Sequence, residues 1–204
     1  MNKEERIKVA KKFAEKALEK FGNLIKSIVL FGSSVREEFK EKSDIDILII
    51  IDETILKRCE KCNSIYIDAE DKLTKCPKCN SELTTHIPES YFEEIDEELE
   101  KIANSIKEAK IKEIDPITKE EKEKSLISLQ PVYLMTQFWD YVRQGHPIVY
   151  NFIKEGIAIY DSGFFKPLQR LWKLGKIPLT REAIEKYIEE VPKRIARVKS
   201  CLLY

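Results

Sequence analysis

Two aspartates stand one residue apart at the start of an apolar run. Asp44 and Asp46 open the segment DIDILIIID, in which Ile45 to Ile51 reads as a β-strand. Side chains alternate between the faces of a strand, so both carboxylates point to one side, about 6–7 Å apart. Like charges this close repel, and carboxylate oxygens are preferred ligands of Mg²⁺ and Mn²⁺. The spacing predicts a divalent-cation site; the alternative is that the acids only solubilise the start of the strand.

A glycine and two serines lie between this strand and the apolar run before it. Glycine lets a ligand approach the backbone closely, and the serines add hydroxyl and N–H donors, so the turn suits a phosphate group. A nearby arginine can neutralise phosphate oxygens, and a serine next to the aspartates can orient their carboxylates. The candidate nucleotide-binding residues are therefore Gly32, Ser33, Ser34, Arg36 and Ser43.

The combined pattern is more specific than either part. Gly32-Ser33 followed by Asp44-x-Asp46 resembles the signature of the nucleotidyltransferase superfamily of the DNA polymerase β type. The region from Leu134 to Lys193 resembles the C-terminal part of archaeal nucleotidyltransferase-domain proteins. The resemblance implies transfer of an NMP, with AMP from ATP expected first, to a protein or RNA acceptor with release of pyrophosphate. Asp44 and Asp46 would be catalytic residues that hold Mg²⁺ or Mn²⁺, and the Gly-Ser turn would grip the triphosphate.

One expected feature of that superfamily is missing. Its enzymes usually carry a third carboxylate on a later strand, where it activates the acceptor hydroxyl. The corresponding strand here, predicted from Leu126 to Leu134, contains no acid, and Gln130, which cannot act as a general base, lies near the expected place. Asp115 serves only if the strand begins earlier, and Asp52 lies about 20 Å from Asp46 along its strand. A base supplied by substrate or water, a slow enzyme and a nucleotide-binding relic all stay open.

Four of the five cysteines form two matched pairs. Cys59-x-x-Cys62 and Cys76-x-x-Cys79 are separated by thirteen residues. Thiolates are soft ligands, and two such turns complete a tetrahedral Cys₄ zinc site, which has no open position for substrate and is therefore expected to be structural. Disulfide bonding is the alternative, which a reducing cytoplasm disfavours. The segment 64–74 between the pairs is predicted to form a small hairpin, so the whole module reads as a zinc ribbon.

The rest of the chain reads as helices around a small sheet. Helices are predicted at 2–21, 88–109, 136–143, 148–154, 164–174 and 180–203, and a further strand at 157–160. The highly charged stretch 110–124 is expected to be a loop. The fold class is thus α/β (α+β), a small mixed sheet flanked by helices with an inserted zinc ribbon and a helical C-terminal region. The boundaries are 1–56 and 84–160 for the nucleotidyltransferase domain, 57–83 for the ribbon and 161–204 for the helical region.

Composition narrows the class of protein. The chain is 43% hydrophobic and 35% charged, with a net charge of zero. It has no apolar run near the roughly 20 residues of a membrane span, and its charged start has no signal core, so a cytoplasmic protein without a membrane partner is expected. Abundant Lys, Glu and Ile with few Gln are typical of a thermophile. Charge is segregated, with 13 acids and 7 bases from Glu89 to Lys124, and 4 acids and 10 bases from Phe165 to Tyr204.

Two other classes of function fit the same residues. Small nucleotidyltransferase-domain proteins often resemble antitoxins paired with a helical toxin-like partner, which implies a regulatory nucleotide-binding module with weak or no catalysis. A zinc-ribbon nucleic-acid binder that keeps the domain as a scaffold is the other class. The ribbon carries 6 bases and 4 acids from Lys57 to Cys79, so its charge does not decide between them.

Overall fold

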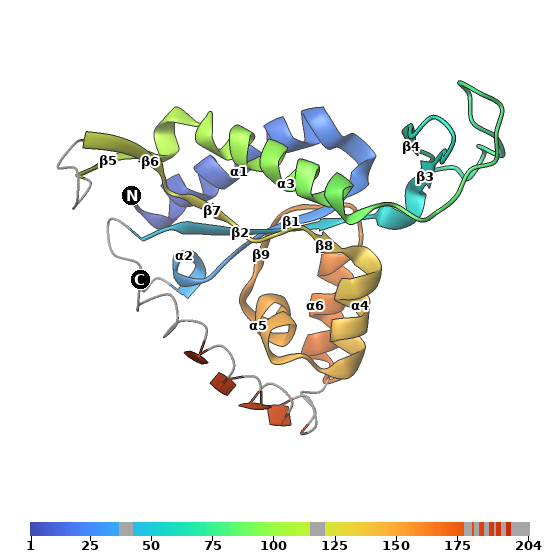
Figure 1. The fold of residues 1–204 in the computed structure, drawn as a ribbon. Coiled ribbons are helices and arrows are strands. Elements are labelled where there is room, and N and C mark those ends of the chain that lie inside the picture. Colours follow the sequence, from blue (N-terminus) through green and yellow to red (C-terminus); the bar gives the residue numbers. More distant parts are fainter. Residues whose placement is uncertain are drawn as a thin grey trace.

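The computed structural model describes residues 1–36, 43–114 and 121–177, and single positions between 181 and 196. A small sheet runs through its centre, with helices on both faces (Figure 1). One face is covered by α1 (Lys3–Phe21) and α3 (Glu89–Asn104), and the other by α4 (Met135–Gln144), α5 (Pro147–Glu155) and α6 (Phe165–Lys173). Within the described ranges, no helix combines the length and the apolar character needed to cross a bilayer.

The sheet is mixed, as predicted. The strands are β1 (Ile25–Phe31), β2 (Ile45–Ile51), β7 (Ile127–Leu129), β8 (Tyr133–Leu134) and β9 (Ile157–Asp161). They lie in the order β7-β2-β1-β9, and β8 also pairs with β2. β1 is antiparallel to β2 and β9, whereas β7 and β8 are parallel to β2. The predicted α/β class with a small mixed sheet is therefore confirmed.

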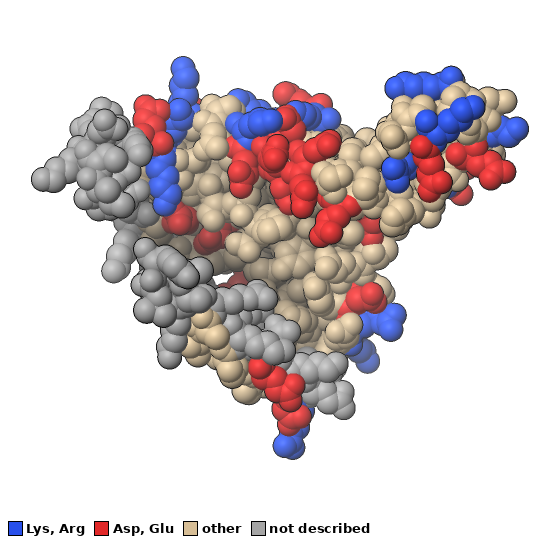
Figure 2. All heavy atoms as spheres, in the orientation of Figure 1, with Lys and Arg blue, Asp and Glu red and all other residues tan. Residues whose placement is uncertain are grey.

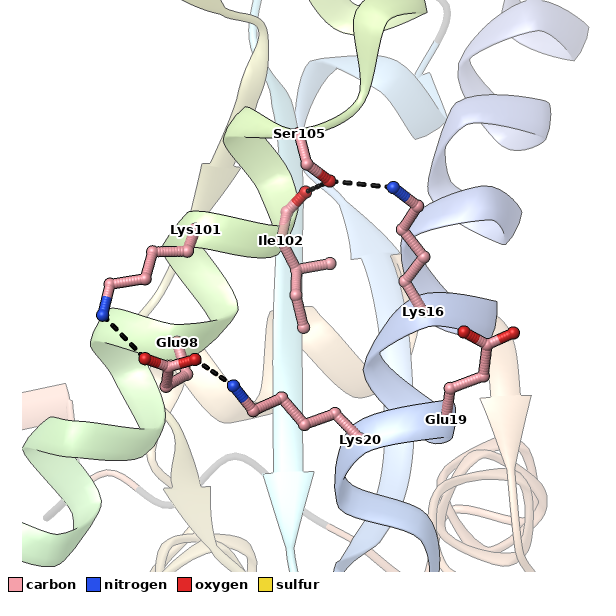
Figure 3. A pocket seen from close by; sticks show the side chains of 7 residues that line it. All are labelled: Lys16, Glu19, Lys20, Glu98, Lys101, Ile102 and Ser105. Atoms are coloured by element: carbon pink, nitrogen blue, oxygen red, sulfur yellow. Dashed lines mark hydrogen bonds and ion pairs between the residues drawn. The ribbon is translucent and has the colours of Figure 1, made fainter.

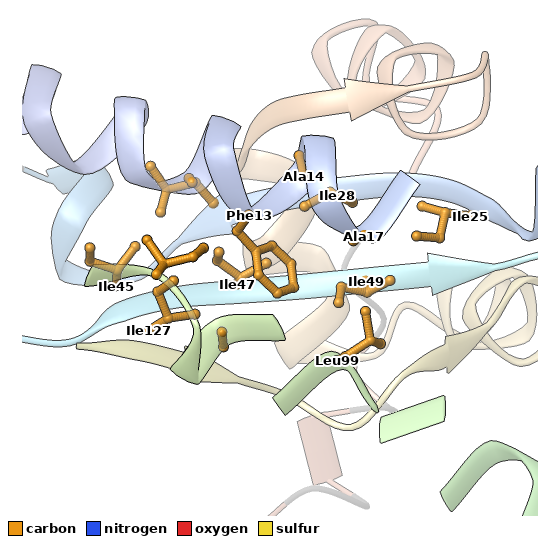
Figure 4. Packing of buried hydrophobic residues seen from close by; sticks show 14 of the residues in the cluster. Phe13, Ala14, Ala17, Ile25, Ile28, Ile45, Ile47, Ile49, Leu99 and Ile127 are labelled. Atoms are coloured by element: carbon orange, nitrogen blue, oxygen red, sulfur yellow. The ribbon is translucent and has the colours of Figure 1, made fainter. Parts of the chain in front are cut away.

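Residues of β2 divide between two cores. Its odd-numbered isoleucines pack with Phe13 of α1 in the first core, under α1 and α3 (Figure 4). Leu48 and Ile50 point the other way, into the second core under α4, α5 and α6. Burying each such side chain contributes about 1.5–3 kcal/mol, so the alternation locks the register of the strand. Asp44 and Asp46 share the even parity of Leu48, which places them on the α4–α6 face.

Helix α1 has strong boundaries. The Asn2 side chain accepts a hydrogen bond from the Glu5 N–H at 2.9 Å, and the Glu5 carboxylate accepts one from the Asn2 N–H at 2.9 Å. This capping box satisfies two backbone donors that the first turn leaves open. At the other end a 3₁₀ turn (Gly22–Leu24) leads into β1. The prediction of a helix at 2–21 is confirmed.

The predicted loop at 110–124 is wrong. It contains β5 (Lys110–Ile114) and β6 (Glu121–Ser125), which pair as an antiparallel hairpin. Opposite charges meet across it, as in the ion pair of Lys110 with Glu123 at 2.8 Å. Such cross-strand pairs stabilise a ribbon that has few apolar residues, and local hydrophobic periodicity does not reveal them.

Other boundaries differ in detail. Helix α3 ends at Asn104, and a separate 3₁₀ turn (Lys107–Ala109) follows, whereas one helix was predicted through 109. The strand predicted through Pro131 is at the edge of the sheet and is interrupted there, between β7 and β8, because proline cannot donate to the ladder. The helix predicted at 180–203 lies outside the described residues, apart from single positions.

The cysteine-rich insertion follows the far end of β2, after the 3₁₀ turn Glu53–Ile55, and projects from the core (Figure 1). Its strands β3 (Leu56–Arg58) and β4 (Ile65–Ile67) pair with each other. The hairpin predicted within 64–74 is therefore wrong, because β4 pairs with the strand before the first cysteine pair. The buried carboxylate of Asp68 instead organises the following loop, accepting backbone hydrogen bonds from Lys72 and Leu73 at 3.0 and 2.8 Å.

Candidate nucleotide site and cysteine cluster

Gly32 and Asp46 are in direct contact. Phe31, the last residue of β1, pairs with Asp46 on β2, and Gly32 follows with φ +72°. A Cβ atom at Gly32 would lie 2.4 Å from Oδ2 of Asp46. Glycine is therefore required both by the backbone conformation and by the close approach of the carboxylate. The Gly-Ser turn and the acid predicted to bind metal form one structural unit.

The two serines of the turn have different surroundings. They begin the short helix α2 (Ser33–Arg36), where Ser33 is half-buried and Ser34 is fully buried. The Ser34 hydroxyl lies 3.3 Å from the carbonyl oxygen of Asp44, to which it donates. The fold thus brings the turn and the start of β2 together, with half-buried Ser43 beside Asp44. The side chain of Arg36 lies outside what the structure describes.

Arg6 of α1 lies buried beneath this turn. Its Nη1 donates to Ser34 Oγ at 3.0 Å and to the carbonyl oxygens of Ser43 and Asp44 at 2.8 and 3.1 Å. Burial lowers the pKa of the Arg6 guanidinium, and the attraction of Asp44 and then Asp46 acts in the opposite direction. A buried cation therefore stands behind the pair of acids.

The sequence reasoning missed Arg6 because it treated the whole N-terminal helix as core. A signal was available in the helical spacing. Arg6 stands three residues before Val9 and seven before Phe13, on the stripe that the helix buries. A charge on such a stripe needs a partner inside the protein, because an unpaired buried charge is strongly unfavourable.

Ser128 occupies the place next to Asp46 on β7. The two residues are partners in the parallel pairing of β2 with β7, so their side chains point to the same face. Gln130, where the sequence suggested looking, follows the end of β7. Asp115 lies outside the described residues, and Asp52 is buried at the opposite end of β2. Along the described part of β7, no acid stands beside Asp46.

A second cation approaches the acids from the hairpin. Nζ of Lys124 lies 4.0 Å from Oδ1 of Asp44, and the two side chains are 57% and 46% exposed. At this exposure the pair contributes about 0–1 kcal/mol, so Lys124 can leave Asp44 readily when another partner arrives. On the side that faces solvent, the cation next to Asp44 can therefore be exchanged, whereas Arg6 is buried on the other side and held by hydrogen bonds.

A groove of about 490 Å³ lies elsewhere, between α1 and α3 (Figure 3). Its charges satisfy one another. Lys101 donates to Glu98 at 2.6 Å, Lys20 also pairs with Glu98, and Lys16 donates to Ser105 at 2.9 Å. The hydrogen bonds from Lys101 and then Lys20 lower the pKa of Glu98 to about 2. Since α1 and α3 cover the face opposite Asp44 and Asp46, this groove is a contact between helices and is separate from the two aspartates.

The four paired cysteines converge at the tip of the insertion. Their sulfurs all lie within 4.8 Å of one another, with Cys59 and Cys79 3.3 Å apart and Cys62 and Cys76 3.5 Å apart. Zinc–sulfur bonds of about 2.3 Å in a tetrahedron place the sulfurs about 3.8 Å apart, so the cluster matches a metal–tetrathiolate centre. The predicted cysteine set is therefore brought together in full.

The two cysteine turns repeat one structure. Each has the sequence Cys-x-Lys-Cys-Asn-Ser, and its first cysteine N–H donates to the carbonyl of the serine, at 2.9 Å in one turn and 2.8 Å in the other. The asparagines, Asn63 and Asn80, have φ of 53° and 58°. Asparagine tolerates this left-handed conformation better than most residues. The sequence reasoning used the cysteine spacing and missed the asparagine and serine that complete each turn.

Tyr66 supports the cluster from β4. Its hydroxyl lies 3.3 Å from Sγ of Cys76. Burial raises the pKa of Cys76, but hydrogen bonds from Tyr66 and from the N–H groups of Cys79 and Lys78 oppose this, and the resulting pKa is about 6. These hydrogen bonds therefore favour the thiolate form of Cys76, which is the form that binds metal. Lys and Arg side chains also line the outer edge of the insertion, whereas Asp and Glu gather over α3 (Figure 2).

Comparison with known families decides the class of protein. The family model of the nucleotidyltransferase domain matches residues 10–132, which is more than half of the chain. This chain is a member of the nucleotidyltransferase-domain family. The matched residues include the Gly-Ser turn, both aspartates and the strand with Ser128. The predicted resemblance is confirmed.

Two other comparisons add less. Among solved structures, the chain is similar to one titled "Crystal structure of the toxin-antitoxin with AMP-PNP", with 13% identity over 94% of this chain and 98% of that chain and a TM-score of 0.34. A search of curated proteins finds no match.

We predict that Gly32→Ala displaces the Asp46 carboxylate. The new methyl group would overlap Oδ2, and overpacking of this kind costs about 1–3 kcal/mol, so Mn²⁺ binding should weaken roughly tenfold or more. Calorimetric titration with Mn²⁺ checks this. Gly22→Ala is the matched control, because Gly22 also has a positive φ but has no atom within 4 Å of the added Cβ. Equal Mn²⁺ affinity in both variants would contradict the prediction.

We also predict that Tyr66→Phe weakens zinc binding by the cysteine cluster about tenfold, because loss of a group that supports a ligand typically costs 10–100-fold in metal affinity. Competition with a chromophoric chelator at neutral pH measures the change. Tyr150→Phe is the control, since Tyr150 lies on α5, where its ring contacts Trp172. A Tyr66→Phe affinity equal to that of the control would refute the supporting role.

Proposed function

We propose that this protein is a Mg²⁺-dependent nucleotidyltransferase that transfers AMP from ATP to a protein or RNA acceptor and releases pyrophosphate. One observation carries the proposal. Asp44 and Asp46 stand two residues apart at the start of β2 and so share a face, and Asp46 lies against the backbone of Gly32 at the start of a Gly-Ser turn. Hard oxygen ligands beside a phosphate-sized backbone turn are what the handling of a metal–triphosphate requires.

Each residue of the chain has a separate task in this proposal. Bound Mg²⁺ would supply positive charge that stabilises the transition state of nucleotidyl transfer. Asp44 and Asp46 hold the cation, and Ser33 and the Gly32 backbone orient the β- and γ-phosphates. Lys124 leaves its weak pair with Asp44 and neutralises phosphate oxygens. These are positioning and electrostatic effects, which account for most of the catalysis of phosphoryl-group chemistry.

The proton of the acceptor is the unusual point. A serine hydroxyl at neutral pH is a poor general base, so Ser128 beside Asp46 does not replace a carboxylate. The acceptor proton then leaves to water or to a group of the acceptor. This arrangement favours slow turnover, and it is also the observation that favours the second candidate function, a regulatory nucleotide-binding module with a protein partner.

Zinc is the metal we propose for the cysteine cluster. Four thiolates at tetrahedral separations are its usual structural ligand set, and they leave no open position for a substrate. The cluster follows the end of β2 opposite to Asp44, so it takes no part in the transfer. Its role is to hold together an insertion whose two short strands provide little core of their own.

We expect the double substitution Asp44→Asn and Asp46→Asn to reduce AMP transfer at least about 100-fold, because several kcal/mol of transition-state stabilisation depend on the cation that these residues hold. The variant should stay folded, because Arg6 donates to the Ser34 hydroxyl and to the backbone carbonyls of Ser43 and Asp44, which the substitutions leave in place. The measurement is label transfer from α-labelled ATP with Mg²⁺ to the protein itself, to total RNA and to co-purified proteins.

Asp140→Asn is the control for that experiment, because Asp140 is a 59% exposed carboxylate on α4 and pairs there with Arg143. It should transfer label like the wild type. Label transfer that is unchanged in the double variant would rule out the proposed enzyme, and Mg·ATP binding without any transfer by the wild type would favour the regulatory module.

A second prediction concerns the missing base. Ser128→Asp places a carboxylate beside Asp46, where it can accept the acceptor proton. General bases contribute about 10²–10⁴-fold when optimally placed, so an unoptimised one should raise turnover about tenfold. The same label-transfer assay measures this, and Ser128→Asn, which adds similar bulk without a base, is the control. A Ser128→Asp rate at or below that of the control would show that proton removal does not limit the reaction.

A further inference from the structure

We infer that Arg6 is the positioning residue of the nucleotide site, in that its guanidinium holds the Gly-Ser turn and the start of β2 in register with each other. The inference rests on the proposed function for its meaning, but its geometry is independent of it. Arg6 lies on a helix that contributes no other residue to the site, and it is fully buried.

The hydrogen bonds of Arg6 join two separate segments. One nitrogen, Nη1, donates to the Ser34 hydroxyl in the turn and to the carbonyl oxygens of Ser43 and Asp44 before β2. Ser34 in turn donates to the Asp44 carbonyl. The Arg6 guanidinium therefore holds both the turn that would bind phosphate and the backbone next to the aspartates that would bind the metal. If one segment moved away from the other, the hydrogen bonds that link them through Arg6 and Ser34 could not all be kept.

The charge of Arg6 has a second effect. It attracts both Asp44 and Asp46 from below, and so offsets part of their mutual repulsion. Lys124 does the same from the solvent side, at 4.0 Å from Asp44. The two acids thus have two protein cations near them, one of which is held rigidly in the interior.

Stability alone does not account for an arginine at this position. Buried charges pay a large desolvation penalty, and well-packed apolar residues are often equally or more stabilising in their place. The neighbours of Arg6 on the buried stripe of α1 are apolar, including Val9, Ala10 and Phe13. A guanidinium at this point is explained by what it orients, since its Nη1 reaches acceptors in both segments and the rigid, planar group fixes the direction of those hydrogen bonds.

The test uses Arg6→Lys, which keeps the charge but loses the fork, and Arg6→Met, which loses both. The probe is Mn²⁺ with a non-hydrolysable ATP analogue, titrated by calorimetry. Amide hydrogen exchange of peptides that cover residues 32–36 and 43–46 reports the order of the two segments. Phe13→Leu is the matched control, because it lowers packing in the same helix and the same core without touching Ser34, Ser43 or Asp44.

We expect both Arg6 variants to bind the probe at least tenfold more weakly and to exchange amide hydrogen faster in those two segments than the wild type. Phe13→Leu should lower the melting temperature while the affinity and the exchange there stay within twofold. Ser34→Ala removes one acceptor of Arg6 without changing α1, so it should also weaken binding of the probe. Its effect on affinity should not add to that of Arg6→Met, because both remove the same hydrogen bond. If the Arg6 variants do not fold, the result with Ser34→Ala decides.

Wild-type affinity and wild-type exchange in the Arg6 variants would overturn the inference, as would equal losses in Phe13→Leu or full rescue by Arg6→Lys. The proposed function fails separately. If the wild type binds no Mn²⁺–nucleotide but the Arg6 variants still loosen only the two segments, the positioning role stands and the nucleotide site does not. If Ser34→Ala binds like the wild type, the link through Ser34 is refuted.

Discussion

The repulsion between Asp44 and Asp46 constrains this whole end of the sheet. Both carboxylates lie on the α4–α6 face, and the packing of Leu48 and Ile50 in the second core prevents β2 from turning them apart. The protein offsets the repulsion with its own cations, Arg6 from beneath and Lys124 from the hairpin. A divalent cation at the proposed site would take over interactions that the two protein cations already make.

The two groups of metal-type ligands stand at opposite ends of the same strand. Hard carboxylate oxygens are at the start of β2, half-exposed and beside a backbone turn. Soft sulfurs follow its far end, where they close around one position and leave no place for substrate. The strand between them is buried in both cores. The carboxylates and the cysteine cluster are thus separated by the length of β2, so we expect changes in the insertion to leave the carboxylates in place.

Local patterns predicted most of the fold correctly and failed where stabilisation came from distant partners. The helix at 2–21 and the interruption at Pro131 follow from capping residues and from the missing proline N–H, which are local properties. The hairpin at 110–125 was missed because the pairing of two strands and ion pairs between them, such as that of Lys110 with Glu123, stabilise it, and the periodicity of a single strand does not contain these contacts. The hairpin placed within 64–74 was wrong because β4 pairs with residues on the other side of Cys59.

By itself, the sequence determined the ligand types and their spacing. Asp44 and Asp46 share a face because side chains in a strand alternate, and each Cys-x-x-Cys pair meets one point because the turn between its members is short; both geometries are set within a few residues. Tertiary structure alone decided that Arg6 lies under the pair and that Ser128, not an acid, stands beside Asp46. Those contacts join segments far apart in the chain, and only the pairing of β2 with β7 and the packing of α1 on the sheet bring them together.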